Sequence, residues 1–438
     1  MLMRSSMCFP KDSIIIESNM GPRLNRLSLR VQVILALFVA YILHYATLPV
    51  PDDLNQIDRW TMRFVAMGVD GGRLAEKFET PFRVPIFNSV IWFLGAWGIR
   101  DVMHQDTFID GVKVRIYEPK HKRPGPMAAI IYLHGGGWVY GDTGSYHGLT
   151  GYLASELRIV VVSVDYRTPP THLFPAAIDD STKAAVWFLQ HAAEYNVDPT
   201  RIAVVGDSCG GNLAAAVTQR LTFQPKYKHL QKLKFHGLIY PVLQSFDFNL
   251  PSYQQSGDKS TLIVRKEMMM EFWSVYMFGD HRLVKHFQTN NHTTAEAKTD
   301  SFASKVISHD NLPRQYLYDP YTPPGASRIG NEEVYNQIKE TLFDPDFAPL
   351  MRENLTGLPP AYVLTAQHDL LRDEDILYTQ RLQKAGVDVT WNHYQHGVHG
   401  IFSMFAVPGV NIAAGRECMR DFIKYAREKL QCVEDCKL

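Results

Sequence analysis

The segment 201–217 constrains the fold of this chain more than any other stretch. It reads RIAVVGDSCGGNLAAAV, in which a short run of β-branched apolar residues leads into a glycine cluster and then into alanines. The apolar run is typical of a strand buried on both faces, and the alanines have high helix propensity. The segment therefore predicts a buried strand, a sharp turn over 206–210 and a helix.

The turn over 206–210 reads Gly-Asp-Ser-Cys-Gly, the G-x-S-x-G pattern of a nucleophile elbow. Such a turn holds its serine in strained backbone geometry and lifts the hydroxyl clear of the sheet. Side chains at the two glycine positions would collide with the strand and the helix. The alternative is a glycine-rich turn without chemistry, since five-residue patterns also arise by chance. We take Ser208 as the candidate nucleophile.

A second glycine cluster follows another apolar run, which reads AAIIYL. Attack on an ester or amide carbonyl creates a tetrahedral oxyanion, and glycines without side chains let backbone N–H groups approach that charge. We predict that the oxyanion hole is formed by the loop of His134, Gly135, Gly136 and Gly137 together with the Cys209 N–H group. A flexible turn is the alternative for the glycine run alone.

An acid that orients the catalytic base is expected after a later strand. Asp369 comes just beyond the apolar run AYVLT. Asp373 and Asp375 compete with it, but they fall in the first turn of a predicted helix, where carboxylates stabilise the helix dipole. We therefore expect Asp369 to be the acid.

The base is expected after the last strand, in a loop between two glycines that contains His399. His396 is the nearest rival, and the two histidines could suggest a metal pair, but no further ligands are apparent. The chain order Ser208, Asp369, His399 is the order of an α/β-hydrolase. His399 would take the serine proton, and Asp369 would hold its tautomer and stabilise the imidazolium.

Strands that alternate with helices over about 300 residues predict a mostly parallel sheet covered on both faces. The expected strands are at 112–117, 128–133, 160–164, 361–365 and 387–391, and a helix is expected at about 145–157. The hydrolase domain is placed at 107–438. A less regular, methionine-rich insertion around 245–350 is expected to form a cap.

The run 31–48 carries no charge over roughly 18 residues, and as a helix it would span about 27 Å, close to the hydrocarbon thickness of a bilayer. Arginines precede it and aspartates follow it, which predicts a cytosolic tail at 1–30 and a body across the membrane. A cleaved signal peptide, leaving a secreted esterase, is the alternative. Residues 49–106 are interpreted as cap or linker helices. Within them, the apolar segment 84–97 is expected over the site, at the membrane interface, or in the core.

The composition limits the kinds of partner and ligand that are expected for the chain. The 45 Lys and Arg residues equal the 45 Asp and Glu residues, so the chain has no excess of positive charge that would indicate binding of nucleic acid. The five cysteines lack zinc spacing, and neither a metal nor a cofactor is expected. Cys432 and Cys436 could form a bridge in an oxidising compartment or belong to a frayed end. Sequons at Asn291 and Asn354 could carry glycans only in the lumen.

Two motifs, HGGGW at 134–138 and GDSCGGN at 206–212, resemble the hormone-sensitive lipase group of α/β-hydrolases. The N-terminal run, DFNLPSYQ at 247–254, DLLRD at 369–373 and the His399-Gly400 pair narrow the resemblance to the arylacetamide deacetylase and neutral cholesterol ester hydrolase branch. The resemblance implies an eight-stranded, mostly parallel sheet with a helical cap. It also implies a single-pass type II protein of the endoplasmic reticulum, with a luminal serine esterase acting on lipid esters or on small esters and amides.

The resemblance also selects Asp369 and His399 over their neighbours, although some positions depart from the pattern. Cys209 stands where alanine is common, and Ala366 stands where this branch often has cysteine, so a family disulfide is expected to be missing. His396 replaces a usual acidic residue. A catalytically idle ligand-binding protein on the same fold is the competing class, because fold does not guarantee chemistry.

Overall fold

The computed structural model describes residues 29–48, 50–77, 101–121, 125–256, 264–323, 330–406 and 412–432. The chain divides into two compact units, 1–47 and 48–438, which are described separately. The predicted tail lies outside the described residues apart from its last two positions. The apolar segment 84–97 and Cys436 also lie outside them.

The first unit contains one described helix, α1 (Leu29–Thr47), which covers most of the uncharged run. At its end the Thr47 hydroxyl donates to the carbonyls of Leu43 and His44, both at 3.0 Å. Among the described residues, none of the helices is long and apolar enough to cross a membrane. The span over 31–48 stays a prediction.

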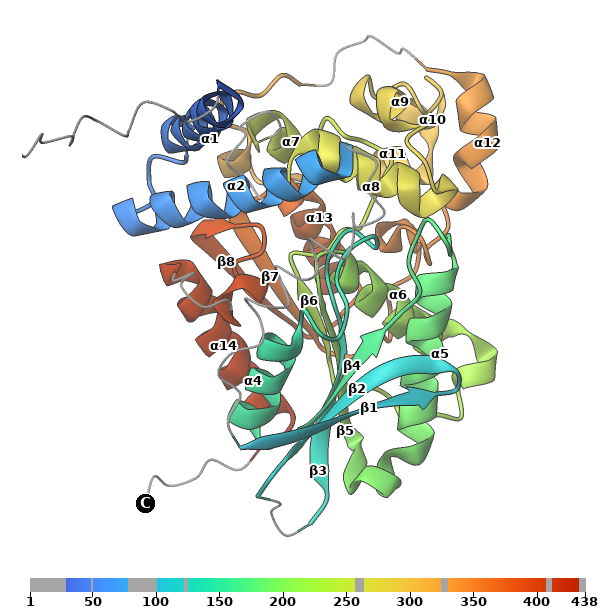
Figure 1. Cartoon of the computed structure of the whole chain (residues 1–438). Helices are drawn as coiled ribbons and strands as arrows, with labels where there is room; N and C mark the ends of the chain where they lie inside the picture. Colours follow the sequence, from blue (N-terminus) through green and yellow to red (C-terminus); the bar gives the residue numbers. More distant parts are fainter. Residues whose placement is uncertain are drawn as a thin grey trace, which may run out of the picture. The chain divides into compact units, whose positions relative to one another are not determined.

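The second unit is built on an eight-stranded sheet in the order β1-β2-β4-β3-β5-β6-β7-β8 (Figure 1). The strands are β1 (Val102–Ile109), β2 (Val112–Pro119), β3 (Met127–Leu133), β4 (Val160–Asp165), β5 (Val197–Asp207), β6 (His236–Ile239), β7 (Ala361–His368) and β8 (Val389–Val398). β2 pairs antiparallel with β1 and β4, and the other neighbours pair parallel. The predicted mostly parallel sheet is confirmed.

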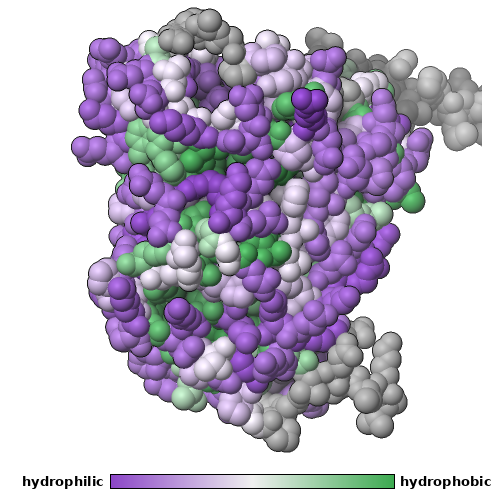
Figure 2. Space-filling model, turned by 180° about the vertical axis from the view of Figure 1, so that it is seen from behind, coloured by the Kyte–Doolittle hydropathy of each residue, from purple (hydrophilic) through white to green (hydrophobic). Residues whose placement is uncertain are grey.

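The central strands are buried on both faces. Alternate residues of β3 enter two separate cores, with Ile131 in one and Ile130 in the other. The main covering helices are α4 (His147–Leu157), α5 (Ala176–His191), α6 (Cys209–Phe223), α13 (Arg372–Lys384) and α14 (Ala413–Lys429). α5, α6 and α13 contribute to the first core and α4 and α14 to the second. On the face seen in Figure 2, hydrophilic residues cover most of the surface and hydrophobic residues gather in its recesses.

The first strand corrects the sequence-based boundary. β1 begins at Val102, so the helical interpretation of 49–106 is wrong from this residue onward, and the domain start at 107 is placed too late. β1 is an edge strand in which four residues in a row, 103–106, are exposed, so it lacks the apolar alternation of a half-buried strand. The Asp110-Gly111 turn that joins it to β2, with both φ angles positive, is the signal that could have found it.

The insertion between β6 and β7 is helical, as expected for 245–350. It contains α7 (Pro251–Ser256), α8 (Lys266–Phe278), α9 (Val284–Gln288), α10 (Ala297–Asp300), α11 (Phe302–Val306) and α12 (Glu332–Leu342). The methionine run lies in α8, where Met269 and Met270 are buried in the core. Upstream, α2 (Gln56–Lys77) is joined to the start of α8 by an ion pair between Asp70 and Arg265.

A buried carboxyl group in α13 makes stability depend on pH. Glu374 is fully buried, and its carboxyl group accepts hydrogen bonds from the Leu243 N–H group at 2.6 Å and the Gln244 amide at 3.1 Å. Burial raises the pKa of Glu374 from 4.5 to about 8. Between pH 4.5 and about pH 8, Glu374 therefore keeps a proton in the folded chain that it has lost in the unfolded chain.

We expect the contribution of Glu374 to stability to be fully present below its unfolded pKa and to be lost as the pH rises toward its folded pKa. Between about pH 5 and pH 8 this loss amounts to roughly 3 kcal/mol. Chemical denaturation at several pH values should show a flatter slope for Glu374→Gln than for wild type. The exposed control Glu333→Gln should keep the wild-type slope, and equal slopes for all three proteins would contradict this assignment.

Candidate active site

Ser208 occupies the turn between β5 and α6 in a strained backbone conformation, with φ +56° and ψ −123°. A positive φ is unfavourable for a residue with a Cβ atom, so the surrounding structure must impose it. The Ser208 N–H group donates to the Ile239 carbonyl at 2.9 Å, and its own carbonyl accepts from the Val242 N–H group at 3.2 Å. These two bonds fix the backbone on both sides of Ser208 to the end of β6 and the residues that follow it.

The two glycines of the motif are required by close backbone approaches. A Cβ atom at Gly206 would lie 2.1 Å from the Gly210 carbonyl oxygen, and one at Gly210 would lie 2.0 Å from the Leu133 oxygen. Both contacts are with backbone atoms, which cannot turn away as a side chain can. Only glycine therefore fits at these two positions, because β3, β5 and α6 meet there.

The structure brings Ser208, His399 and Asp369 together from the ends of β5, β8 and β7. His399 Nε2 lies 3.0 Å from Ser208 Oγ, and His399 Nδ1 lies 2.7 Å from Asp369 Oδ2. The other oxygen of Asp369 accepts the Leu371 N–H group at 2.9 Å. Asp369 is 1% exposed and His399 is 5% exposed, so this chain of hydrogen bonds is largely shielded from water.

The rival residues have other contacts. Asp373 accepts hydrogen bonds from the guanidinium of Arg372 and from the Ser252 N–H group. His396 is exposed, and its Nδ1 lies 3.0 Å from Asp53, which also contacts His368 at 2.9 Å.

The third carboxyl candidate, Asp375, is buried on α13, and none of the described residues donates a hydrogen bond to its carboxyl group. Burial, together with the neighbouring carboxylates, raises the pKa of Asp375 well above its ordinary value.

One of the predicted oxyanion donors, the Gly135 N–H group, already has hydrogen-bond acceptors in the structure. The Gly135 N–H group donates to the Tyr146 hydroxyl at 3.0 Å and to Asp207 at 3.1 Å, so it is already engaged. The Gly136 and Cys209 N–H groups have no hydrogen-bond acceptor within the described part of the chain. The Gly137 N–H group faces the Cys209 thiol, so the N–H groups of Gly136 and Cys209 are the candidate donors that remain.

His134 helps to hold the loop in place. Its buried ring stacks on Tyr166 with centroids 4.2 Å apart, and its carbonyl accepts the Tyr166 hydroxyl at 2.7 Å. A Cβ atom at Gly137 would lie 2.4 Å from the ring of Phe272, so the cap helix α8 closes over this end of the loop.

Asp207, the residue before the serine, joins the elbow to the glycine loop. Its carboxylate accepts hydrogen bonds from the Tyr132 hydroxyl at 2.8 Å, the Tyr146 hydroxyl at 2.9 Å and the Gly135 N–H group. Asp207 is 2% exposed, and burial raises its pKa. This role of Asp207 was not predicted from the sequence, although a carboxylate inside the glycine motif was a signal that could have indicated it.

Cys209 forms a second link between the same elements. Its sulfur accepts the Trp138 N–H group at 3.1 Å, and burial raises the pKa of the thiol to about 12, so the group stays neutral. The Trp138 indole in turn stacks on Tyr276 of α8, with centroids 4.4 Å apart and planes 3° apart. The thiol that departs from the family pattern is thus a hydrogen-bond acceptor in the support of the loop.

Within the described residues no group of three or more His, Cys, Asp or Glu side chains is placed to hold a metal ion. Cys209 and Cys418 are buried free thiols. The bridge between Cys432 and Cys436 stays a prediction.

Comparison with known proteins identifies the class. A family model described as "alpha/beta hydrolase fold" matches residues 130–296 and 299–403, and the chain belongs to this family. Mouse (Mus musculus) neutral cholesterol ester hydrolase 1 is 34% identical over 412 residues, which cover 91% of this chain and 99% of that protein. Mouse arylacetamide deacetylase is 36% identical over 393 residues, which cover 86% and 95%.

A thermostable carboxylesterase, EstE1, has a similar solved structure, with a TM-score of 0.58 at 27% identity over 78% of this chain and 95% of that one. The family resemblance predicted from the motifs is confirmed. With these relatives, the chain is a hydrolase of carboxylic esters, as the sequence predicted.

We expect Asp207→Ala to lower kcat/KM by about tenfold or more, because the glycine loop loses its anchor to the elbow. The buried Tyr132 hydroxyl and Gly135 N–H group also lose this acceptor, at about 1–3 kcal/mol each. Ester hydrolysis and thermal denaturation measure the two effects. Asp310→Ala, at an exposed position, is the control. A wild-type kcat/KM in Asp207→Ala would rule out the anchoring role.

Proposed function

We propose that this chain is a membrane-anchored serine esterase that cleaves lipid esters, or small acyl esters and amides, through an acyl-enzyme at Ser208. The observation that carries the proposal is the continuous hydrogen-bond chain from Asp369 through His399 to Ser208, with distances of 2.7 and 3.0 Å. These distances fall in the range in which a base can accept the proton of a nucleophile.

In the acylation step, Ser208 Oγ attacks the carbonyl carbon of the substrate while His399 Nε2 takes the hydroxyl proton. The carbonyl oxygen becomes an oxyanion that the N–H groups of Gly136 and Cys209 would stabilise. When the intermediate collapses, the bond to the leaving group breaks, and His399 returns its proton to the departing alcohol or amine. The acyl group remains on Ser208.

In the deacylation step, water attacks the acyl carbon, and His399 now takes a proton from the water. The carboxylic acid leaves, and the proton returns to Ser208 Oγ. Asp369 keeps the proton of the neutral imidazole on Nδ1 and stabilises the imidazolium that forms in each half of the cycle. The Leu371 N–H group at 2.9 Å holds the orientation of this carboxylate.

The relatives support a lipid or small acyl substrate. One is named for hydrolysis of neutral cholesterol esters and the other for deacetylation of arylacetamides. The ring of Phe272, on the cap helix α8, lies against the glycine loop at Gly137 and favours an apolar acyl or leaving group. The idle ligand-binding alternative is disfavoured because such a protein has no need for the aligned serine and histidine.

The anchor is supported by the uncharged run and by α2. Three large apolar side chains of α2, Ile57, Trp60 and Phe64, are 68%, 53% and 63% exposed. Their spacing of three and four residues places them on one side of the helix, an arrangement typical of helices that lie at a membrane surface. With the arginines before 31–48, this favours a type II protein of the endoplasmic reticulum whose hydrolase domain is luminal.

We expect Ser208→Ala and His399→Gln each to lower kcat by about 10³-fold or more, because the members of a catalytic triad act as a unit. Hydrolysis of p-nitrophenyl esters of increasing acyl length measures this loss and reports the preferred acyl group. His396→Gln serves as the matched control and should keep wild-type activity. The proposal fails if either of the first two variants hydrolyses esters at the wild-type rate.

The luminal orientation predicts glycosylation, and the two sequons differ in exposure. Asn354 is exposed, whereas Asn291 is half-buried beside His286 and its partner Thr293 is buried. We expect Asn354→Gln to remove most of the shift that endoglycosidase digestion produces on a gel, with Asn336→Gln as control. A wild type that shows no shift would place the domain outside the lumen, and loss of residues 31–48 from the mature protein would favour the secreted alternative.

A further inference from the structure

A cavity of about 520 Å³ lies between α4 and α14, and none of its lining residues belongs to the candidate active site. Its floor is apolar and consists of Tyr152, Phe405, Met419 and Ile423. Met419 and Ile423 are 1% and 6% exposed, and the rings of Tyr152 and Phe405 pack with centroids 4.9 Å apart. The volume falls within the range of about 300–1,000 Å³ that is common for small-molecule sites.

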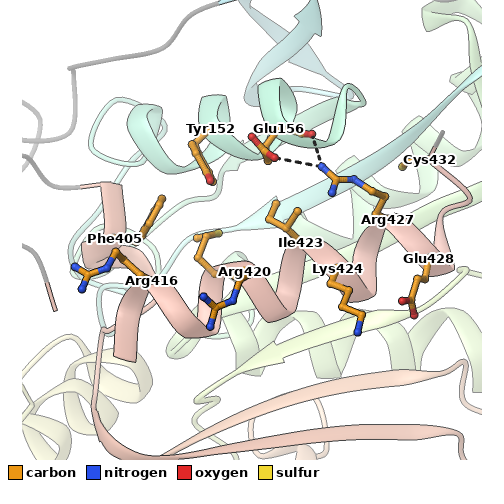
Figure 3. Close-up of a pocket in the computed structure, with 11 residues that line it drawn as sticks. Tyr152, Glu156, Phe405, Arg416, Arg420, Ile423, Lys424, Arg427, Glu428 and Cys432 are labelled. Carbon is orange, nitrogen blue, oxygen red and sulfur yellow. Dashed lines mark hydrogen bonds and ion pairs between the residues drawn. The ribbon is translucent and has the colours of Figure 1, made fainter. Parts of the chain in front are cut away.

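The edge of this cavity is cationic. Arg416, Arg420 and Lys424 follow one another at intervals of four residues, which places them along one side of α14. In Figure 3, Ile423 and Arg427 point from α14 toward α4, and Tyr152 and Glu156 point from α4 toward α14, whereas the charged ends of Arg420 and Lys424 point away from α4.

Cationic side chains outnumber acidic ones around this cavity. Four cationic side chains line the cavity against two acidic ones, Glu156 and Glu428. Glu156 is paired with Arg427 at 3.2 Å, and the Arg427 guanidinium also donates to the Glu156 carbonyl at 3.1 Å, which ties α14 to α4. Arg420 and Lys424 are exposed, and no described side chain or carbonyl accepts a hydrogen bond from either.

We propose that this cavity binds a long-chain fatty acid, with its alkyl chain on the apolar floor and its carboxylate against Arg420 and Lys424. The apolar floor excludes a small inorganic anion as the best ligand, because such an anion would leave the floor in contact with water. The cations disfavour a neutral sterol or alcohol, which offers no charged acceptor. A guanidinium and an ammonium group form strong, charge-assisted hydrogen bonds with a carboxylate.

The acid released by hydrolysis of a fatty-acyl ester has this chemistry, but binding here does not require chemistry at Ser208. Photo-crosslinking can therefore separate the two sites. Full-length Ser208→Ala protein is irradiated with a diazirine-bearing fatty acid, and the labelled peptides are mapped by mass spectrometry. We expect labelling within residues 152–156 or 416–427 that excess oleate prevents and excess oleyl alcohol does not. Labelling confined to peptides around residues 134–138, 208 and 399 would overturn the proposal.

Charge reversal provides the matched test. We expect Arg420→Glu/Lys424→Glu to weaken binding of oleate at the α4/α14 site by about tenfold or more, measured by equilibrium dialysis with the labelling pattern as a check. The control Lys226→Glu/Lys228→Glu makes the same change in net charge at exposed positions outside the cavity.

Thermal denaturation shows whether the double variant is folded, and Arg420→Gln/Lys424→Gln replaces it if it is not. Equal binding by wild type and variant, or equal weakening by the control, would overturn the site. Binding of phosphatidylserine vesicles without binding of monomeric oleate would also overturn it, because a membrane surface would then be the partner.

Discussion

The strained backbone at Ser208 is the constraint on which the rest of the site depends. A residue with a Cβ atom adopts a φ of +56° only where its neighbours leave no alternative. Here β5 enters the turn and α6 leaves it, while the backbone of β3 passes within 2.0 Å of where a Cβ atom of Gly210 would lie. The turn thus aims the serine hydroxyl at His399 because three elements meet at glycine positions.

The same turn also organises the oxyanion side of the site. Asp207 and Cys209, on either side of the serine, hold Gly135 and the Trp138 N–H group of the glycine loop. Trp138 then stacks on Tyr276, so the cap helix α8 belongs to the same packed unit. A change in the cap can therefore be transmitted to the oxyanion donors through contacts between rigid, buried groups.

Much of this arrangement could be predicted because its signals are local. The central strands are fully buried and appear as continuous apolar runs, and the glycine motifs are short patterns with a steric cause. What could not be predicted depends on contacts between distant segments or on exposure. Strand β1 was not predicted because residues 103–106 face solvent, so the strand lacks the apolar pattern of a buried one. The engagement of Gly135 by Asp207 joins residues 72 positions apart, and the pairing of Asp53 with His396 joins residues 343 positions apart.

If Ser208 is a nucleophile activated by His399, a covalent probe should form its adduct on Ser208 and should need His399 to do so. A fluorophosphonate probe reacts with a serine only when a base removes its proton as the bond to phosphorus forms. We expect one adduct per chain, on the peptide that contains Ser208, and a large loss of this adduct in folded His399→Gln protein. An adduct on another residue, or undiminished labelling of Ser208 without His399, would contradict it.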